Sequence, residues 1–478
     1  MDFFKFTGHF YTPFKMNISN PVNPAKQILP WLTALAIFMQ ALDGTILNTA
    51  LPAIANEFGQ SSLQMQSVIV SYTVTLAILI PLSGWLSDKF GTRNIFVASV
   101  LIFTLGSILC AFSFDISTLV CARIVQAFGG AMMVPVARLA ILYSYPKNQL
   151  LRVINFITIP GLVGQVIGPS LGGFLSDYYS WHWIFLINIP IGLLGVFLAY
   201  KKMPNIIKPV GKFDILGLLY LSTTIVALTV IMEFLSLGIT IWTLIIGTLL
   251  ITLLSVILYI KHSKKQEKPI IDLNLFKVDT LRIGLVGNLF TRLGVGGMPF
   301  LLPLFLQIGY GHSAATSGLL LIPSALSNIL AKYAVIPLIR NFGYRKILVS
   351  NTLILALIII AFSATTKETP LFYFVPLMMF FGAANSIQMS SMNTITIADL
   401  NNDTASSGNS LLAIMQQLSN SFGVSIAALF LSLLTNFESG DFTITQAFKY
   451  TFIIIGLITA LSSLVFRNLK ESAGSNLT

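Results

Sequence analysis

Apolar segments of about 20 residues recur along this chain, separated by short polar and basic stretches. The hydrocarbon core of a bilayer needs about 20 apolar residues per helix, so each segment predicts one membrane span. The pattern predicts fourteen spans, near residues 28–51, 66–86, 94–113, 117–142, 153–175, 182–200, 213–232, 239–260, 281–308, 314–338, 347–365, 370–395, 407–435 and 443–466.

The composition supports a membrane protein and excludes a soluble one. Of the 478 residues, 55% are hydrophobic and only 9% are charged, whereas soluble domains carry about 25% charged residues. The net charge of +11 does not indicate nucleic-acid binding, because the basic residues lie in short loops rather than on one contiguous face. We therefore expect an all-α polytopic membrane protein in contact with lipid, with no nucleic-acid partner.

The distribution of basic residues predicts the orientation. With fourteen spans both termini lie on one side, and 22 of the 28 Lys and Arg residues fall on that side. The opposite loops keep only Lys367 and Lys449, and four basic residues fall within spans. By the positive-inside rule, both termini are cytoplasmic.

A short repeat divides the chain into two halves. Residues 88–95 read DKFGTRNI and residues 340–347 read RNFGYRKI, and each segment joins the second and third spans of its half. Transporters are often built from such repeats, with the substrate site between them. We expect a cytoplasmic tail (1–27), a six-helix bundle (28–202), two additional central spans with a basic loop (203–268) and a second six-helix bundle (269–478).

Two charged residues lie deep within spans of the first half. Asp43 lies ~12 Å and Arg123 ~9 Å from the predicted outer ends of their helices. Charges at that depth are costly and usually functional, and they satisfy each other best as a pair. Such a pair could exchange protons, or it could merely fix helix packing.

Two glycine-containing motifs predict moving or closely packed parts. Gly84, Asp88, Gly91 and Arg93 border the inner surface, where they could form a charge latch or be ordinary interfacial residues. The repeat carries the corresponding positions Arg340, Gly343 and Arg345.

In the fifth span, glycines recur every four residues and give a smooth face for close helix packing. A proline within this face bends the helix, which could act as a hinge or seal. The residues of this motif are Gly164, Gly168, Pro169, Gly172 and Gly173.

Polar residues inside several spans predict a water-filled substrate cavity. Arg292 lies near mid-depth of its span with no acid nearby in sequence, which suggests that an anionic substrate could compensate its charge. A contact with backbone carbonyls near Pro299 or Pro303 would satisfy it equally well. The side chains predicted to line the cavity are Gln126, Asn288, Arg292, Asn385, Gln388 and Gln417.

Taken together, these motifs resemble the major facilitator superfamily, specifically its fourteen-span drug:proton antiporter family and most closely the MdtD-like subgroup. The resemblance implies alternating access and proton-driven export across the bacterial inner membrane. Separately, we expect a monomer without cofactor or metal. It assigns proton coupling to Asp43 and Arg123, and the latch to Asp88 and Arg93. Family members that export cations often carry an additional acid in span 10, where this sequence has Lys332.

Other functional classes fit less well. A membrane-embedded enzyme would need a catalytic motif, and neither H-E-x-x-H nor a phosphate-binding G-x-x-x-x-G-K-[ST] occurs. A receptor that uses a transporter fold without transport is the alternative, although embedded charges argue against it. The substrate is either drug-like or an anionic metabolite.

Overall fold

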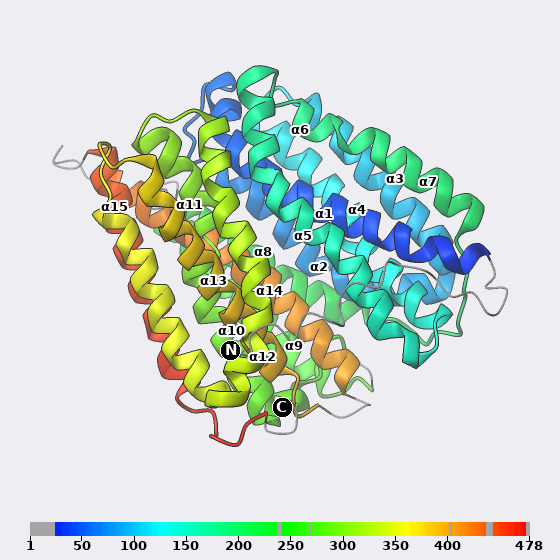
Figure 1. The fold of residues 1–478 in the computed structure, drawn as a ribbon. Helices are drawn as coiled ribbons and strands as arrows, with labels where there is room; N and C mark the ends of the chain where they lie inside the picture. The colour runs from blue at the N-terminus through cyan, green and yellow to red at the C-terminus, as the bar shows by residue number, and fades with distance from the viewer. Residues whose placement is uncertain (1–23, 237–240, 268, 401–403, 436–442, 475–478) are drawn as a thin grey trace, which may run out of the picture.

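The computed structural model of the protein describes residues 24–236, 241–267, 269–400, 404–435 and 443–474. Regular structure in these ranges is helical throughout. Figure 1 shows the early helices and the late helices gathered into two neighbouring groups. The described part confirms the predicted all-helical fold.

The described residues of the first half, from Pro24 onward, form seven helices. The predicted span at 182–200 is interrupted near Ile187. α1 begins at Pro24, inside the segment expected to be a tail, and residues 1–23 lie outside the described residues. The helices are α1 (Pro24–Glu57), α2 (Gln66–Phe90), α3 (Thr92–Ala111), α4 (Ile116–Ser144), α5 (Lys147–Tyr178), α6 (Trp183–Leu186) and α7 (Asn188–Lys202).

The remaining elements form the central pair and the second half. They are α8 (Ile215–Ser236), α9 (Trp242–Ser263), η1 (Leu273–Lys277), α10 (Asp279–Val295), α11 (Met298–Leu304), η2 (Phe305–Gly309), α12 (Ala314–Ala361), η3 (Phe362–Ala364), α13 (Leu371–Thr396), α14 (Ala405–Thr435) and α15 (Ile444–Phe466).

The described residues contain thirteen continuous helices that are long and apolar enough to cross a membrane. One of them, α12, is long enough for two crossings, which gives fourteen. α12 has 48 residues, or about 72 Å at 1.5 Å per residue, more than twice the thickness of a hydrocarbon core. Gly343 breaks it with a φ of 75°, a conformation that favours glycine. Gly91 has a φ of 95° at the corresponding turn between α2 and α3, so the repeat seen in the sequence is also a repeat in backbone geometry.

The predicted span at 281–308 is also interrupted, where α10 ends and α11 begins. A Cβ atom on Gly297 would lie 2.7 Å from the carbonyl oxygen of Gly423 in α14. Small residues therefore let the two backbones approach closely here. The interruption places Arg292 in the last turn of α10, beside α14.

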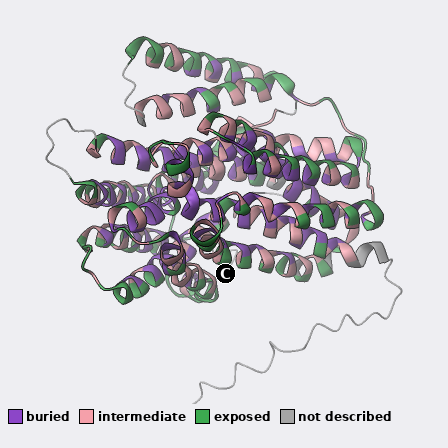
Figure 2. Ribbon diagram, turned by 90° about the horizontal axis from the view of Figure 1, so that it is seen from above, coloured by how far each residue is buried: buried purple, intermediate pink, exposed green. Residues whose placement is uncertain are grey.

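The central helices α8 and α9 lie at the edge of the molecule. α9 packs mainly against α8, and α8 also contacts α2 and α14. Leucines of α9 such as Leu250 and Leu254 are 60% and 58% exposed. Figure 2 shows that exposed residues cover the outer surface while buried residues face inward. Exposed apolar side chains on such helices face lipid.

Candidate functional site

A cavity of about 550 Å³ lies between the two halves. α1, α2, α4 and α5 contribute one wall, and α10 to α14 contribute the other. Its polar lining comprises Gln40, Thr45, Asn48, Tyr72, Thr73, Arg123, Gln165, Arg292, Ser324, Asn328, Asn385, Gln417 and Asn420. Its described lining includes two arginines and neither Asp nor Glu.

Beside this cavity, Asp43 and Arg123 form a buried ion pair. Arg123 Nη1 donates to Asp43 Oδ2 at 2.8 Å, and each residue is 1% exposed. Gln126 Nε2 donates to Asp43 Oδ1 at 2.8 Å, and Asn188 Nδ2 approaches the same oxygen at 3.4 Å. Ser107 Oγ accepts from Gln126 at 2.8 Å. Four helices, α1, α3, α4 and α7, therefore converge on one carboxylate.

Arg123 connects Asp43 to the cavity wall. The Arg123 side chain lines the cavity, whereas Asp43 does not. The guanidinium carbon lies 4.1 Å from the ring centroid of Tyr72, which also lines the cavity. A cation over an aromatic face is stabilised by the ring's electrons. A movement of the Arg123 side chain at the cavity wall would therefore directly alter the surroundings of the Asp43 carboxylate.

Arg292 occupies the opposite wall and has no acidic partner among the described residues. Its Nε donates to Asn288 Oδ1 at 3.2 Å, and its Nη1 donates to Asn420 Oδ1 at 3.1 Å. These two amide oxygens satisfy part of the guanidinium but carry no net charge. Within the described ranges, the Arg292 side chain makes no hydrogen bond to the backbone around Pro299 or Pro303. No acidic side chain of the described part of the chain therefore compensates the charge of Arg292 at the cavity wall.

Asn385 and Gln417 also lie on the wall, as the sequence predicts. The Oδ1 atom of Asn385 is buried without a hydrogen-bond partner among the described residues. An unsatisfied acceptor of this kind costs about 1–3 kcal/mol. A ligand donor, or water, would remove this cost.

The lining of this cavity does not include Gln126, Asn288 and Gln388, which the sequence predicts there and which are fully buried in this structure. Gln126 bonds Asp43, and Asn288 supports Arg292. Gln388 Nε2 donates to Thr352 Oγ1 at 2.8 Å, as Gln126 does to Ser107. These amides hold helices together within each half because a buried amide needs partners.

Several polar residues of the wall were not predicted from the sequence, and they include Gln40, Asn48, Gln165, Asn328 and Asn420. A signal was present, since Asn328 follows Ser324 by four residues and Asn420 follows Gln417 by three, which places each pair on one helix face. Lys332 follows Asn328 by a further four residues and is exposed, so it continues the same face.

Comparisons with known proteins identify the family. The sequence profile of the Major Facilitator Superfamily matches residues 33–424. The chain belongs to the major facilitator superfamily. It is 43% identical to MdtD of Salmonella typhimurium and to MdtD of Salmonella heidelberg, proteins named for multidrug resistance, over 94% of this chain and 96% of theirs. The superfamily consists of membrane transporters, not enzymes.

Solved structures of other superfamily members share the fold at low sequence identity. The D-xylose-proton symporter superposes with a TM-score of 0.68 at 15% identity, covering 93% of this chain and 98% of its own. The POT family transporter PepTSo gives the same TM-score at 13% identity, covering 93% and 97%. The cavity between the halves thus lies where members of the superfamily have their central interface.

The predicted charge latch of this superfamily member contains no ion pair in its described residues. The Tyr143 hydroxyl donates to Asp88 Oδ1 at 3.0 Å, and the guanidinium of Arg93 lies 5.9 Å from the ring centroid of Tyr200. In the repeat, Arg345 pairs with the exposed Glu471 at 3.4 Å, and Arg340 is exposed. The side chains of Asp88 and Arg93 therefore meet tyrosines of the first half, while their backbone groups bond to Lys208 and Asn205 of the following segment.

The glycine face of α5 packs against α1. A Cβ atom on Gly164 would lie 3.0 Å from the carbonyl oxygen of Phe38, and Cβ atoms on Gly168 and Gly172 would overlap Thr45 and Ile46. Thr49 Oγ1 donates to the carbonyl of Pro169 at 2.9 Å. Close packing of this kind requires glycine.

At its far end the same helix contacts the second half. A Cβ atom on Gly173 would overlap the backbone of Ala314 at the start of α12. The Asp177 carboxylate accepts hydrogen bonds from the backbone N–H groups of Ala314 and Ala315 at 3.3 and 2.7 Å. A carboxylate at a helix N-terminus satisfies free N–H groups and interacts favourably with the helix dipole. The halves are joined here, at the end predicted to face outward.

Proposed function

We propose that this protein is a secondary active exporter of the bacterial inner membrane, which exchanges protons for small molecules by alternating access. One observation carries the proposal: Arg123, which forms a buried ion pair with Asp43, itself lines the inter-half cavity. A titratable carboxylate at this place can couple proton binding to rearrangement of the wall. Protonation would neutralise Asp43 and leave Arg123 without its counter-charge.

The charge of the wall favours an anionic substrate over a cationic one. The described lining has two arginines, of which Asp43 compensates only Arg123, and no acidic residue. A guanidinium binds a carboxylate or phosphate through two parallel hydrogen bonds. We therefore place a carboxylate-bearing metabolite ahead of a cationic drug, with uncharged drug-like compounds as the other candidates.

Transport is tested by uptake into inside-out membrane vesicles. With an inwardly directed proton pump energising the vesicles, an exporter accumulates candidate substrates in the lumen, and a protonophore abolishes the accumulation. Vesicles from cells without the protein serve as the control. A receptor that does not transport would bind substrate without accumulation, and this result would reject the proposal.

The orientation is tested by labelling single cysteines. We expect a cysteine at Lys367 to react from outside with an impermeant maleimide and a cysteine at Lys264 to react only after permeabilisation, because basic loops stay cytoplasmic. Both positions are exposed. Cys110 and Cys121 are first replaced to remove background labelling. Equal labelling of the two positions in intact cells would contradict the orientation.

A further inference from the structure

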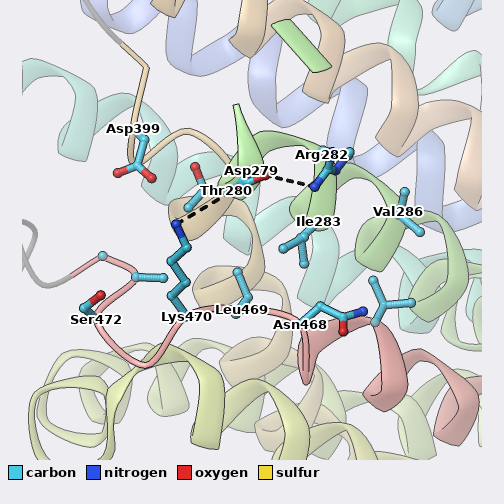
Figure 3. A pocket seen from close by; sticks show the side chains of 13 residues that line it. Asp279, Thr280, Arg282, Ile283, Val286, Asp399, Asn468, Leu469, Lys470 and Ser472 are labelled. Atoms are coloured by element: carbon cyan, nitrogen blue, oxygen red, sulfur yellow. Dashed lines mark hydrogen bonds and ion pairs between the residues drawn. The ribbon is translucent and has the colours of Figure 1, made fainter. Parts of the chain in front are cut away.

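A second cavity, of about 720 Å³, lies where α10 begins and α15 ends, away from the inter-half cavity. Figure 3 shows its labelled side chains, with Asp279 linked to both Arg282 and Lys470. The distances are 2.9 Å to Arg282 Nη2 and 3.8 Å to Lys470 Nζ. Asp399 lies on the same rim and forms no ion pair among the described residues. We call this cavity the terminal niche.

The part of the terminal niche formed by the helical residues of α10 and α15 below the charged rim is apolar. Ile283 and Val286 of α10 and Val465 of α15 line it. Val286 is 37% exposed, and the exposure continues along the same helices at Phe290 (39%) and Leu461 (58%). Exposed apolar side chains on spanning helices face acyl chains. The niche therefore places a charged rim next to apolar side chains that face lipid.

The rim has a balanced charge and an unsatisfied polar group. Two carboxylates and two cations line it, so its formal charge is zero and it does not attract an anion as such. Thr280, also in the lining, is 4% exposed, and its hydroxyl has no partner among the described residues. A ligand with both a hydrogen-bond-donating cation and an anionic acceptor would match Asp399, Thr280 and the two basic side chains.

We propose that the terminal niche binds a phospholipid whose headgroup carries a primary ammonium group beside its phosphate. The ammonium donates to the free Asp399 carboxylate, and the phosphate accepts from Lys470 and Arg282. An acyl chain lies along Ile283, Val286 and Val465. A quaternary ammonium lacks N–H donors and cannot donate to Asp399, while an anionic headgroup with hydroxyls but no cation offers Asp399 no charge-assisted donor.

The test compares three phospholipids with the same acyl chains. Purified full-length protein in detergent is incubated with an equimolar mixture of phosphatidylethanolamine, phosphatidylcholine and phosphatidylglycerol, and retained lipid is measured by native mass spectrometry. We expect phosphatidylethanolamine to be retained about tenfold more than either other lipid, the ratio that corresponds to one charge-assisted hydrogen bond. Equal retention, or a preference for phosphatidylglycerol, would overturn the proposal.

Two double variants test whether the phospholipid binds in the terminal niche. Asp399→Asn combined with Lys470→Gln should reduce retained phosphatidylethanolamine to the level of phosphatidylcholine. Glu267→Gln combined with Lys264→Gln removes the same two charges from an exposed loop outside the niche and should change nothing. Unfolding temperatures in detergent establish that both double variants are folded. Unchanged retention in the niche variant, or equal losses in both, would contradict the assignment.

Discussion

Replacing Asp43 with asparagine is expected to abolish proton-driven transport. Asparagine nearly matches aspartate in shape and can keep the contacts with Gln126 and Asn188, but it cannot be ionised. Pumped inside-out vesicles carrying Asp43→Asn should accumulate substrate no better than vesicles without the protein. Concentrative uptake by this variant would show that Asp43 has only a structural role.

A second variant separates coupling from folding. Asp43→Asn alone leaves the buried Arg123 without a counter-charge, which costs about 3–5 kcal/mol. Combining Asp43→Asn with Arg123→Gln removes both charges and should restore the unfolding temperature towards that of the wild type, while transport stays absent. Recovery of proton-driven transport in the double variant would contradict a coupling role for the pair.

Replacing Arg292 with glutamine is expected to impair the transport of acidic compounds selectively. Loss of a charge-assisted pair costs about 1.5–3 kcal/mol, so the KM for a carboxylate should rise about 10- to 100-fold. Arg292→Lys keeps the charge but not the two parallel hydrogen bonds, and it should give an intermediate KM. Acidic, neutral and cationic candidates are measured side by side in the same vesicles.

The control for this series is Arg467→Gln, which removes an exposed arginine beyond α15. It should leave every KM unchanged. If Arg292→Gln alters cation transport and leaves acid transport intact, the anionic assignment is wrong. If it reduces transport of all substrates equally, Arg292 supports the wall through Asn288 and Asn420 rather than binding substrate.

Much of the fold follows from the sequence, because its strongest signals are long and local. An apolar run of about 20 residues has few alternatives to a spanning helix. The matching segments around Gly91 and Gly343 predicted equivalent turns, and both glycines have positive φ. The Asp43–Arg123 pair was predictable because two isolated opposite charges at similar depth in the membrane lower their cost by pairing with each other.

The lining of the cavity was harder to predict, since helix rotation decides which polar residue faces it. Asn385 and Gln388 are three residues apart, yet the first lines the cavity and the second is buried against Thr352. Periodicity places both on roughly the same side of α13 but does not specify what packs there. The interruption at Gly296 and Gly297 likewise depends on the contact with α14, which lies far away in the sequence.

The direction of proton movement is the central question for the mechanism. Protonation of Asp43 exposes the charge of Arg123, and local electrostatics alone would then favour an anion entering together with the proton. Antiport requires instead that the protein changes between its outward-facing and inward-facing states only when it carries either the proton or the substrate. Measuring protons and substrate together distinguishes these two cases.

The most direct measurement uses purified protein reconstituted into liposomes that contain a pH-sensitive dye and substrate, without a pump. When substrate leaves down its gradient, we expect the lumen to become more acidic as protons enter in exchange, and liposomes with Asp43→Asn should show no such change. Substrate efflux with an unchanged or more alkaline lumen in wild-type liposomes would contradict proton antiport.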